Sequence, residues 1–293
     1  MKLVLIHGRG QAGLDPQLLQ QQWLTALHHG CARARVQLPA DTVVEFPYYG
    51  DALAQAVAEI DSPLDAAIRA KGLLAGPDVA LAGEILLELA AHAGIHESDI
   101  VLEVGSVPVE RGPANWGWVQ ALLRAVDRLP GLNSQLLTAF TRDVSVYLSY
   151  DGVRARVNDI VAATLSTTEP CVVLAHSLGT VVAYDILRER GASPQYPGLV
   201  TVGSPLGIRA IQRQLATPLV SPPGVAHWFN AYDNHDVVAL LPLDARYFNV
   251  TPAIENKSDV LNHTEDRHGI MGYLTDPVVA RRIVEALEGR HPA

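Results

Sequence analysis

Short apolar runs recur along the chain and predict buried strands. Residues 3–6 and 171–175 are apolar throughout, which is typical of strands covered on both faces of a parallel sheet. Three further runs are rich in β-branched or aromatic residues: 42–46, 199–202 and 226–232. We expect these segments to lie in one mainly parallel sheet of about six strands.

Helical patterns alternate with these runs in the second half of the chain. Apolar side chains recur at helical spacing over residues 153–165, 178–186 and 277–287. A helix between consecutive strands is the usual connection in a parallel sheet, and it places helices on both faces. The pattern therefore predicts an α/β protein.

Residues 51–140 have a different character, with Ala- and Leu-rich segments at helical spacing and no strand-like run. Gly-Pro pairs at 76–77 and 112–113 mark turns between these helical segments. We predict a core formed by residues 1–50 and 141–293, with 51–140 as a helical insertion.

Composition narrows the classes of partner. A chain of 293 residues with 48% apolar and 18% charged residues is typical of a packed globular protein. Its net charge of −9 and lack of a basic run argue against nucleic acid and anionic membrane surfaces as partners.

The start of the chain and the cysteines bear on location. Only four apolar residues stand in a row at residues 3–6, so we expect no signal sequence and no integral membrane segment. Cys31 and Cys171 are too few for a disulfide framework. A cytoplasmic location is the resulting expectation.

The sharpest motif is Ala-His-Ser-Leu-Gly at residues 175–179, between an apolar strand and a helical pattern. A nucleophile elbow needs small residues two before and two after its serine, because strand and helix pass close together there. Ala175 and Gly179 meet this need, although the first position is usually Gly. The alternative is that Ser177 only caps the following helix.

Together with an early His-Gly turn at 7–8 and Gly-Ser-Pro-Leu-Gly at 203–207, this motif resembles the α/β-hydrolase superfamily, particularly its lipase-like and esterase-like members. The resemblance covers residues 1–47 and about 145–293, and the segment between them matches nothing that we can name. It implies an α/β-hydrolase fold in which the insertion 51–140 is a helical cap or lid. It also implies a serine hydrolase that cleaves a carboxylic ester through an acyl-enzyme intermediate.

The resemblance also implies an oxyanion hole built from two backbone N–H groups. Its donors here would be Leu178 and Arg9, with Gly8 as a substitute for the latter. Other interpretations of residues 7–10 are a turn chosen only for its backbone angles, or a phosphate loop. The segment lacks the Gly-Lys-Ser/Thr ending that a phosphate loop would have.

A serine nucleophile needs a histidine base and a carboxylate, which follow it in the order acid, then His in this superfamily. Asp236, followed by two valines, resembles the superfamily's Asp-x-Val arrangement, and Asp233 is the alternative. Either could be an ordinary turn residue. His268, shortly before an aromatic residue and the last helix, is preferred to His263 as the base. The predicted triad is Ser177, Asp236 and His268.

Other side chains near these positions allow further interpretations. A metal site could be assembled from His235, Asp236, His263, Asp266 and His268, but no spacing among them matches a metal signature. We therefore expect no metal and no organic cofactor.

One residue of the motif and two tryptophans of the insertion have more than one possible role. His176 fits a packing or hydrogen-bonding role better than that of a second base. Trp116 and Trp118 could line an acyl pocket or simply pack the insertion onto the core.

The sequence thus predicts a serine esterase that acts on a small-molecule ester. The Ala- and Leu-rich insertion indicates that the acyl or alcohol part of this ester is apolar. Thioester or amide cleavage by the same triad is an alternative. A non-catalytic binding protein of the same fold is another, because fold likeness alone does not fix function.

Overall fold

A computed structural model describes residues 1–60, 77–104, 112, 116–128, 133–165, 169–190, 195–265 and 267–290. Its centre is a six-stranded sheet with the order β2-β1-β3-β4-β5-β6, in which every neighbouring pair is parallel. The predicted α/β class and parallel sheet are confirmed. The strands are β1 (Lys2–Ile6), β2 (Val43–Glu45), β3 (Cys171–His176), β4 (Leu199–Val202), β5 (Trp228–Ala231) and β6 (Glu255–Lys257).

Five of these strands coincide with the predicted apolar runs to within about two residues at each end. The sixth, β6, was not predicted. Its residues Glu255, Asn256 and Lys257 are polar and only half-buried, because β6 is an edge strand whose single partner is β5. An edge strand needs no continuous apolar run, so hydrophobicity alone does not reveal it.

Helices α1 (Pro16–Ala34), α11 (Ile270–Leu274) and α12 (Pro277–Leu287) cover one face of the sheet. Their apolar side chains pack with Leu3 and Leu5 of β1 and with Val172 and Leu174 of β3. No hydrophobic pattern in the sequence led us to expect α1. Its start is nevertheless signalled, because Asp15 caps it and Pro16 occupies its first turn.

Helices α8 (Asp151–Ala162) and α9 (Leu178–Glu189) belong to the apolar core on the opposite face. The alternate residues Val4 and Ile6 of β1, and Val173 and Ala175 of β3, are in this second core. Successive side chains of a strand point to opposite faces. Both faces are covered, which explains why the predicted strands are apolar throughout.

Between β2 and β3, the described part of the chain contains helices and no strand. Besides α8, these helices are α2 (Gly50–Ile60), α4 (Pro77–His92), α5 (Glu97–Val104), α6 (Trp116–Val126) and α7 (Ser134–Ser149). The insertion's expected end at residue 140 falls inside α7, which continues without a break to Ser149.

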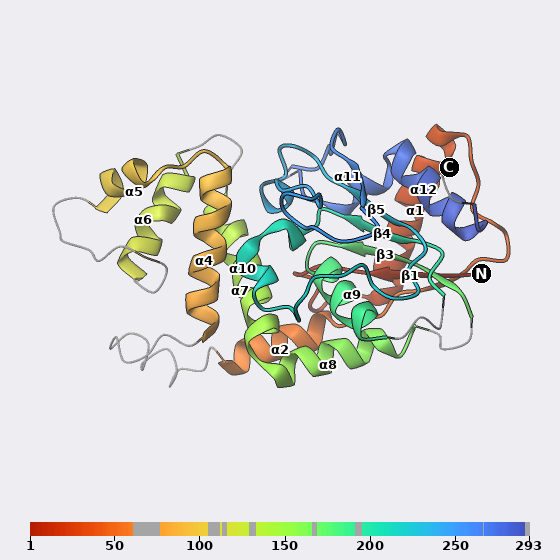
Figure 1. Cartoon of the computed structure of the whole chain (residues 1–293), viewed down its shortest axis with the longest axis horizontal. Coiled ribbons are helices and arrows are strands. Elements are labelled where there is room, and N and C mark those ends of the chain that lie inside the picture. The colour runs from red at the N-terminus through yellow and green to blue at the C-terminus, as the bar shows by residue number, and fades with distance from the viewer. Residues whose placement is uncertain are drawn as a thin grey trace.

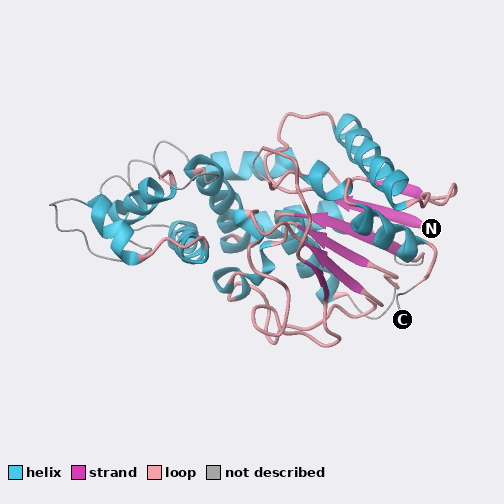
Figure 2. Cartoon of the chain, turned by 90° about the horizontal axis from the view of Figure 1, so that it is seen from above, coloured by secondary structure: helices cyan, strands magenta, loops and turns pink. Residues whose placement is uncertain are grey.

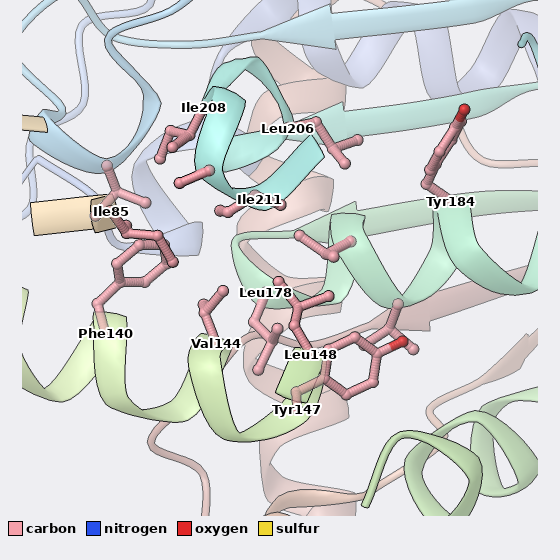
Figure 3. Packing of buried hydrophobic residues seen from close by; sticks show 14 of the residues in the cluster. Ile85, Phe140, Val144, Tyr147, Leu148, Leu178, Tyr184, Leu206, Ile208 and Ile211 are labelled. Atoms are coloured by element: carbon pink, nitrogen blue, oxygen red, sulfur yellow. The ribbon is translucent and has the colours of Figure 1, made fainter. Parts of the chain in front are cut away.

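The helices α4, α5 and α6 lie at one end of the molecule (Figure 1). The strand arrows point toward that same end (Figure 2), so the carboxyl ends of the strands face it. Side chains of α4, α7, α9 and the short helix α10 (Arg209–Gln212) point toward one another there, among them Ile85, Phe140, Leu178 and Ile211 (Figure 3). The helices α2 and α4–α7, called the helical segment below, therefore share one apolar core with the sheet.

No single helix in the described residues is long and apolar enough to cross a bilayer. One bent pair, α4 and α5, meets the criteria of length and composition when the two are taken together.

Candidate active site

Ser177 occupies a sharp turn between β3 and α9. Its backbone angles are φ 54° and ψ −129°, a combination that residues other than glycine rarely adopt and that costs roughly 1–3 kcal/mol. The turn is held by hydrogen bonds from Ser177 N to Val202 O at 3.2 Å and from Thr180 N to Ser177 O at 2.9 Å. The surrounding structure thus stabilises an unfavourable conformation at this one serine.

The Ser177 side chain does not cap α9, although Ser177 directly precedes that helix. Its Oγ atom lies 2.8 Å from Nε2 of His268 instead. The interpretation of this serine as a simple helix cap is therefore wrong.

His268 links Ser177 to a buried carboxylate. Its Nδ1 atom lies 2.7 Å from Oδ2 of Asp236, and Asp236 has no exposed surface. A carboxylate oxygen accepts hydrogen bonds, so this geometry assigns Nδ1–H as the donor to Asp236 and leaves Nε2 to accept from the serine hydroxyl. The structure brings together Ser177, Asp236 and His268, which lie in the segments that follow β3, β5 and β6.

Two glycines allow the chain to pass close to Ser177. A Cβ atom at Gly8 would lie 2.8 Å from Cβ of Ser177, and one at Gly179 would collide with the backbone oxygens of Ile6 and His7. The turn after β1 and the start of α9 are therefore in direct contact. Only glycine fits at these two positions without a shift.

The two predicted oxyanion donors lie on either side of this contact. Leu178 is the first residue of α9, so its N–H has no acceptor within the helix and lies at the positive end of the helix dipole. Arg9 lies in the turn after β1, and its side chain forms an ion pair with Asp143 of α7 at 2.8 Å. This pair ties the turn to the helical segment.

The strand order makes this position a natural ligand site. From β1 the chain continues to β2 on one side, and from β3 it continues to β4 on the other. In open α/β sheets, ligands bind in the crevice beyond the carboxyl ends of two strands at such a reversal. Residues 7–10 and Ser177 follow these two strands.

His7 fixes the turn after β1. Its Nδ1–H donates to Gly8 O at 2.7 Å, and its Nε2 accepts from Tyr49 N at 3.1 Å. The Tyr49 hydroxyl donates to His7 O. Burial lowers the pKa of His7 to about 4, so the ring is neutral near pH 7 and keeps both hydrogen bonds.

His176 supports the backbone of His268. Its Nε2–H donates to the carbonyl oxygen of His268 at 2.8 Å, and burial lowers its pKa well below the usual value. A neutral ring engaged in this way positions His268, in line with the hydrogen-bonding role expected from the sequence.

Tyr273 of α11 is a site residue that was not predicted from the sequence. Its hydroxyl donates to Oδ2 of Asp236 at 2.5 Å and accepts from Asp233 N at 3.3 Å. Burial, and next the charge of Asp236, raises the pKa of Tyr273 well above its usual value, so the hydroxyl stays protonated. The aromatic residue after His268 was the only signal in the sequence, and it carried no indication of this contact.

The alternative acid and base have other surroundings. Asp233 is buried, and each of its carboxylate oxygens accepts a hydrogen bond from a backbone N–H. The donors are His235 N and Asn262 N, both at 2.8 Å. It joins the loop after β5 to the loop that carries His268. His263 lies on this second loop and is exposed to solvent.

The metal interpretation can be tested only in part, because Asp266 lies outside the described residues. Within those residues, no group of three His, Cys, Asp or Glu side chains is arranged to hold a metal ion. Trp118 is buried in the core that the helical segment shares with the sheet, and the side chain of Trp116 lies outside the described part.

A scan of protein-family models gave no match to this chain, and searches of curated proteins and of solved structures gave none either. Any functional class must therefore be argued from the sequence and the geometry of the site.

Proposed function

We propose that this protein is a serine hydrolase with an α/β-hydrolase fold that cleaves carboxylic esters. The observation that carries the proposal is the strained backbone of Ser177 combined with its 2.8 Å contact to His268. Strain at a non-glycine residue persists where function requires it, and an elbow serine is a recognised case. The chain order of Ser177, Asp236 and His268 is also that of the superfamily.

In the first step, Ser177 Oγ attacks the acyl carbon of the ester while His268 Nε2 accepts the hydroxyl proton. The imidazolium that forms is stabilised by Asp236, which accepts from Nδ1. The carbonyl oxygen gains the negative charge, and the N–H groups of Leu178 and Arg9 would donate to it. His268 then protonates the leaving alcohol as the tetrahedral intermediate collapses to an acyl-enzyme.

In the second step, water attacks the acyl-enzyme with the same histidine as general base. His268 takes a proton from the water and returns it to Ser177 Oγ when the acid is released. The reaction needs only groups of this chain and water. The predicted absence of a metal or organic cofactor fits this chemistry and remains a prediction.

Access to the nucleophile depends on the helical segment, which would serve as the cap. Ser177 is only 1% exposed, and the ring of Phe140 from α7 stands edge-on to that of His268 with 6.4 Å between centroids. Apolar side chains of α4, α7 and α10 pack around Leu178, the residue that follows Ser177 (Figure 3). These surroundings favour an ester with an apolar acyl or alcohol part.

Two observations favour a catalytic over a purely binding role. The hydrogen-bonded chain from Ser177 through His268 to Asp236 is complete, whereas a binding protein needs no strained serine. Thioester and amide cleavage use the same machinery and stay as alternatives within the hydrolase class.

The experiment is hydrolysis of p-nitrophenyl esters by wild type and by the variants Ser177→Ala, His268→Ala and His263→Ala. We expect turnover by wild type, a fall in kcat of about 10⁴-fold or more for the first two variants, and near-wild-type activity for His263→Ala. His263 is exposed on the same loop as His268, which makes it a matched control. Equal activity of all four proteins would contradict the proposed triad.

A further inference from the structure

A cavity of about 210 Å³ lies beside the turn after β1. Its walls come from three elements: the turn itself, including Gly8 and Arg9; α2, including Leu53, Ala54 and Val57; and Asp143 of α7. The volume is below the roughly 300–1,000 Å³ of sites that enclose a whole drug-sized ligand. The cavity thus suits one part of a larger molecule.

The cavity adjoins the nucleophile. Gly8 forms part of its wall and also lies against Ser177, since a Cβ at Gly8 would come within 2.8 Å of Cβ of Ser177. Gly8 therefore lies between Ser177 and the cavity, and its lack of a side chain keeps the two close together.

The sheet order decides which part of an ester would enter. His268 and Asp236 follow β6 and β5, on one side of β3, whereas the cavity is built from the turn after β1 and from α2, which follows β2, on the other side. The leaving group must lie on the side of His268, because that residue protonates it. The acyl chain then extends to the opposite side, toward the cavity.

The charged side chains of the cavity limit which acyl groups it can bind. Arg9 and Asp143 are its charged side chains, and they pair with each other at 2.8 Å. Their charges cancel locally, so an anionic acyl group would find no unpaired cation. Leu53, Ala54 and Val57 present only carbon atoms.

We infer that this cavity is the acyl-chain site of the enzyme and selects esters of short, neutral, apolar acids. This inference rests on the proposed function. The side chains of α2 at its wall would set the preferred chain length.

The test measures kcat/KM for p-nitrophenyl acetate, butyrate, hexanoate and octanoate. Ala54→Phe places a ring at the cavity wall from an exposed position of α2, and Ala58→Phe makes the same change at an exposed position of that helix outside the cavity. A steric mismatch of one methylene or more changes kcat/KM by about tenfold or more. We expect Ala54→Phe to lower the hexanoate-to-acetate ratio by at least that factor, and Ala58→Phe to retain the wild-type ratio.

Val57→Ala enlarges the cavity and provides a second variant if Ala54→Phe does not fold. It should raise the octanoate-to-butyrate ratio several-fold. Unchanged ratios in Ala54→Phe and Val57→Ala, with an active wild type, would overturn the inference and leave the proposed function intact. A wild type that hydrolyses no ester in the series would overturn the proposed function, and the acyl site with it.

Discussion

The Tyr273 hydroxyl donates a 2.5 Å hydrogen bond to Oδ2 of Asp236, the same oxygen that lies 2.7 Å from Nδ1 of His268. The other oxygen, Oδ1, accepts from Val238 N at 3.0 Å. A distance of 2.5 Å is typical of a hydroxyl bound to a charged carboxylate. Two donors therefore share the negative charge of one oxygen. The hydrogen bond from Tyr273 weakens the stabilisation that this charge gives to the His268 imidazolium.

Replacing Tyr273 with Phe removes the hydroxyl and keeps the ring. Asp236 then has one donor fewer, so its charge acts more strongly on His268 and raises the pKa of the imidazole. We predict that the acidic limb of the kcat/KM profile moves to higher pH in Tyr273→Phe. The measurement is ester hydrolysis from pH 5 to 9, on wild type and variant. A variant that is merely less active, with an unmoved limb, would show that Tyr273 has only a packing role.

Gly179 is the position where a side chain is least tolerable. A methyl group there would meet the backbone oxygens of Ile6 and His7, and overpacking of this kind costs about 1–3 kcal/mol or more. We predict that Gly179→Ala lowers the free energy of unfolding by at least this amount, as measured by urea denaturation.

Gly152→Ala is the matched control for this substitution. Gly152 is exposed in the first turn of α8 and has open space around its Cβ position. Its replacement should leave stability unchanged or raise it by up to about 1 kcal/mol. Equal stability of the two variants would contradict the close approach of α9 to the turn after β1.

The buried neutral His7 predicts a pH dependence of stability. Its pKa is about 4 in the folded protein against 6.5 for the free side chain, so the unfolded chain binds a proton over this interval and the folded protein does not. Stability therefore falls as pH drops from 6.5 to about 4, with a slope from this group of up to about 1.4 kcal/mol per pH unit. Well above pH 6.5 the group contributes no slope.

Urea denaturation at several pH values between 4 and 7 measures this dependence. In His7→Gln, which retains a donor and an acceptor but does not titrate, the slope should be smaller by up to that amount. Identical slopes in the two proteins would indicate that His7 is protonated or solvated in the folded state.

The sequence predicted the parts of this fold that depend on local pattern. Strands such as β1 and β3 are buried on both faces, so their residues had to be apolar in a continuous run. The polar edge strand β6 has no such requirement and was missed. Helix α1 was also missed, although Asp15 and Pro16 marked its start.

Within the candidate site, sequence order and motif singled out Ser177, Asp236 and His268, and the structure brings these three side chains into contact. The residues that hold these three side chains in place could not be predicted in the same way. The bonds of Tyr273 to Asp236 and of His7 to Tyr49 join residues distant in sequence. Such contacts depend on where the tertiary fold places α11 and the residue just before α2, which no local pattern encodes.

The most direct test of the central claim is covalent labelling with a fluorophosphonate, followed by intact-mass measurement and peptide mapping. An activated serine nucleophile reacts with this probe, whereas an ordinary hydroxyl does not. We predict one label per chain on the peptide that contains Ser177, and no label in Ser177→Ala or in wild type unfolded beforehand. A folded wild type that takes no label, or that carries it on another residue, would contradict the assignment of Ser177 as the nucleophile.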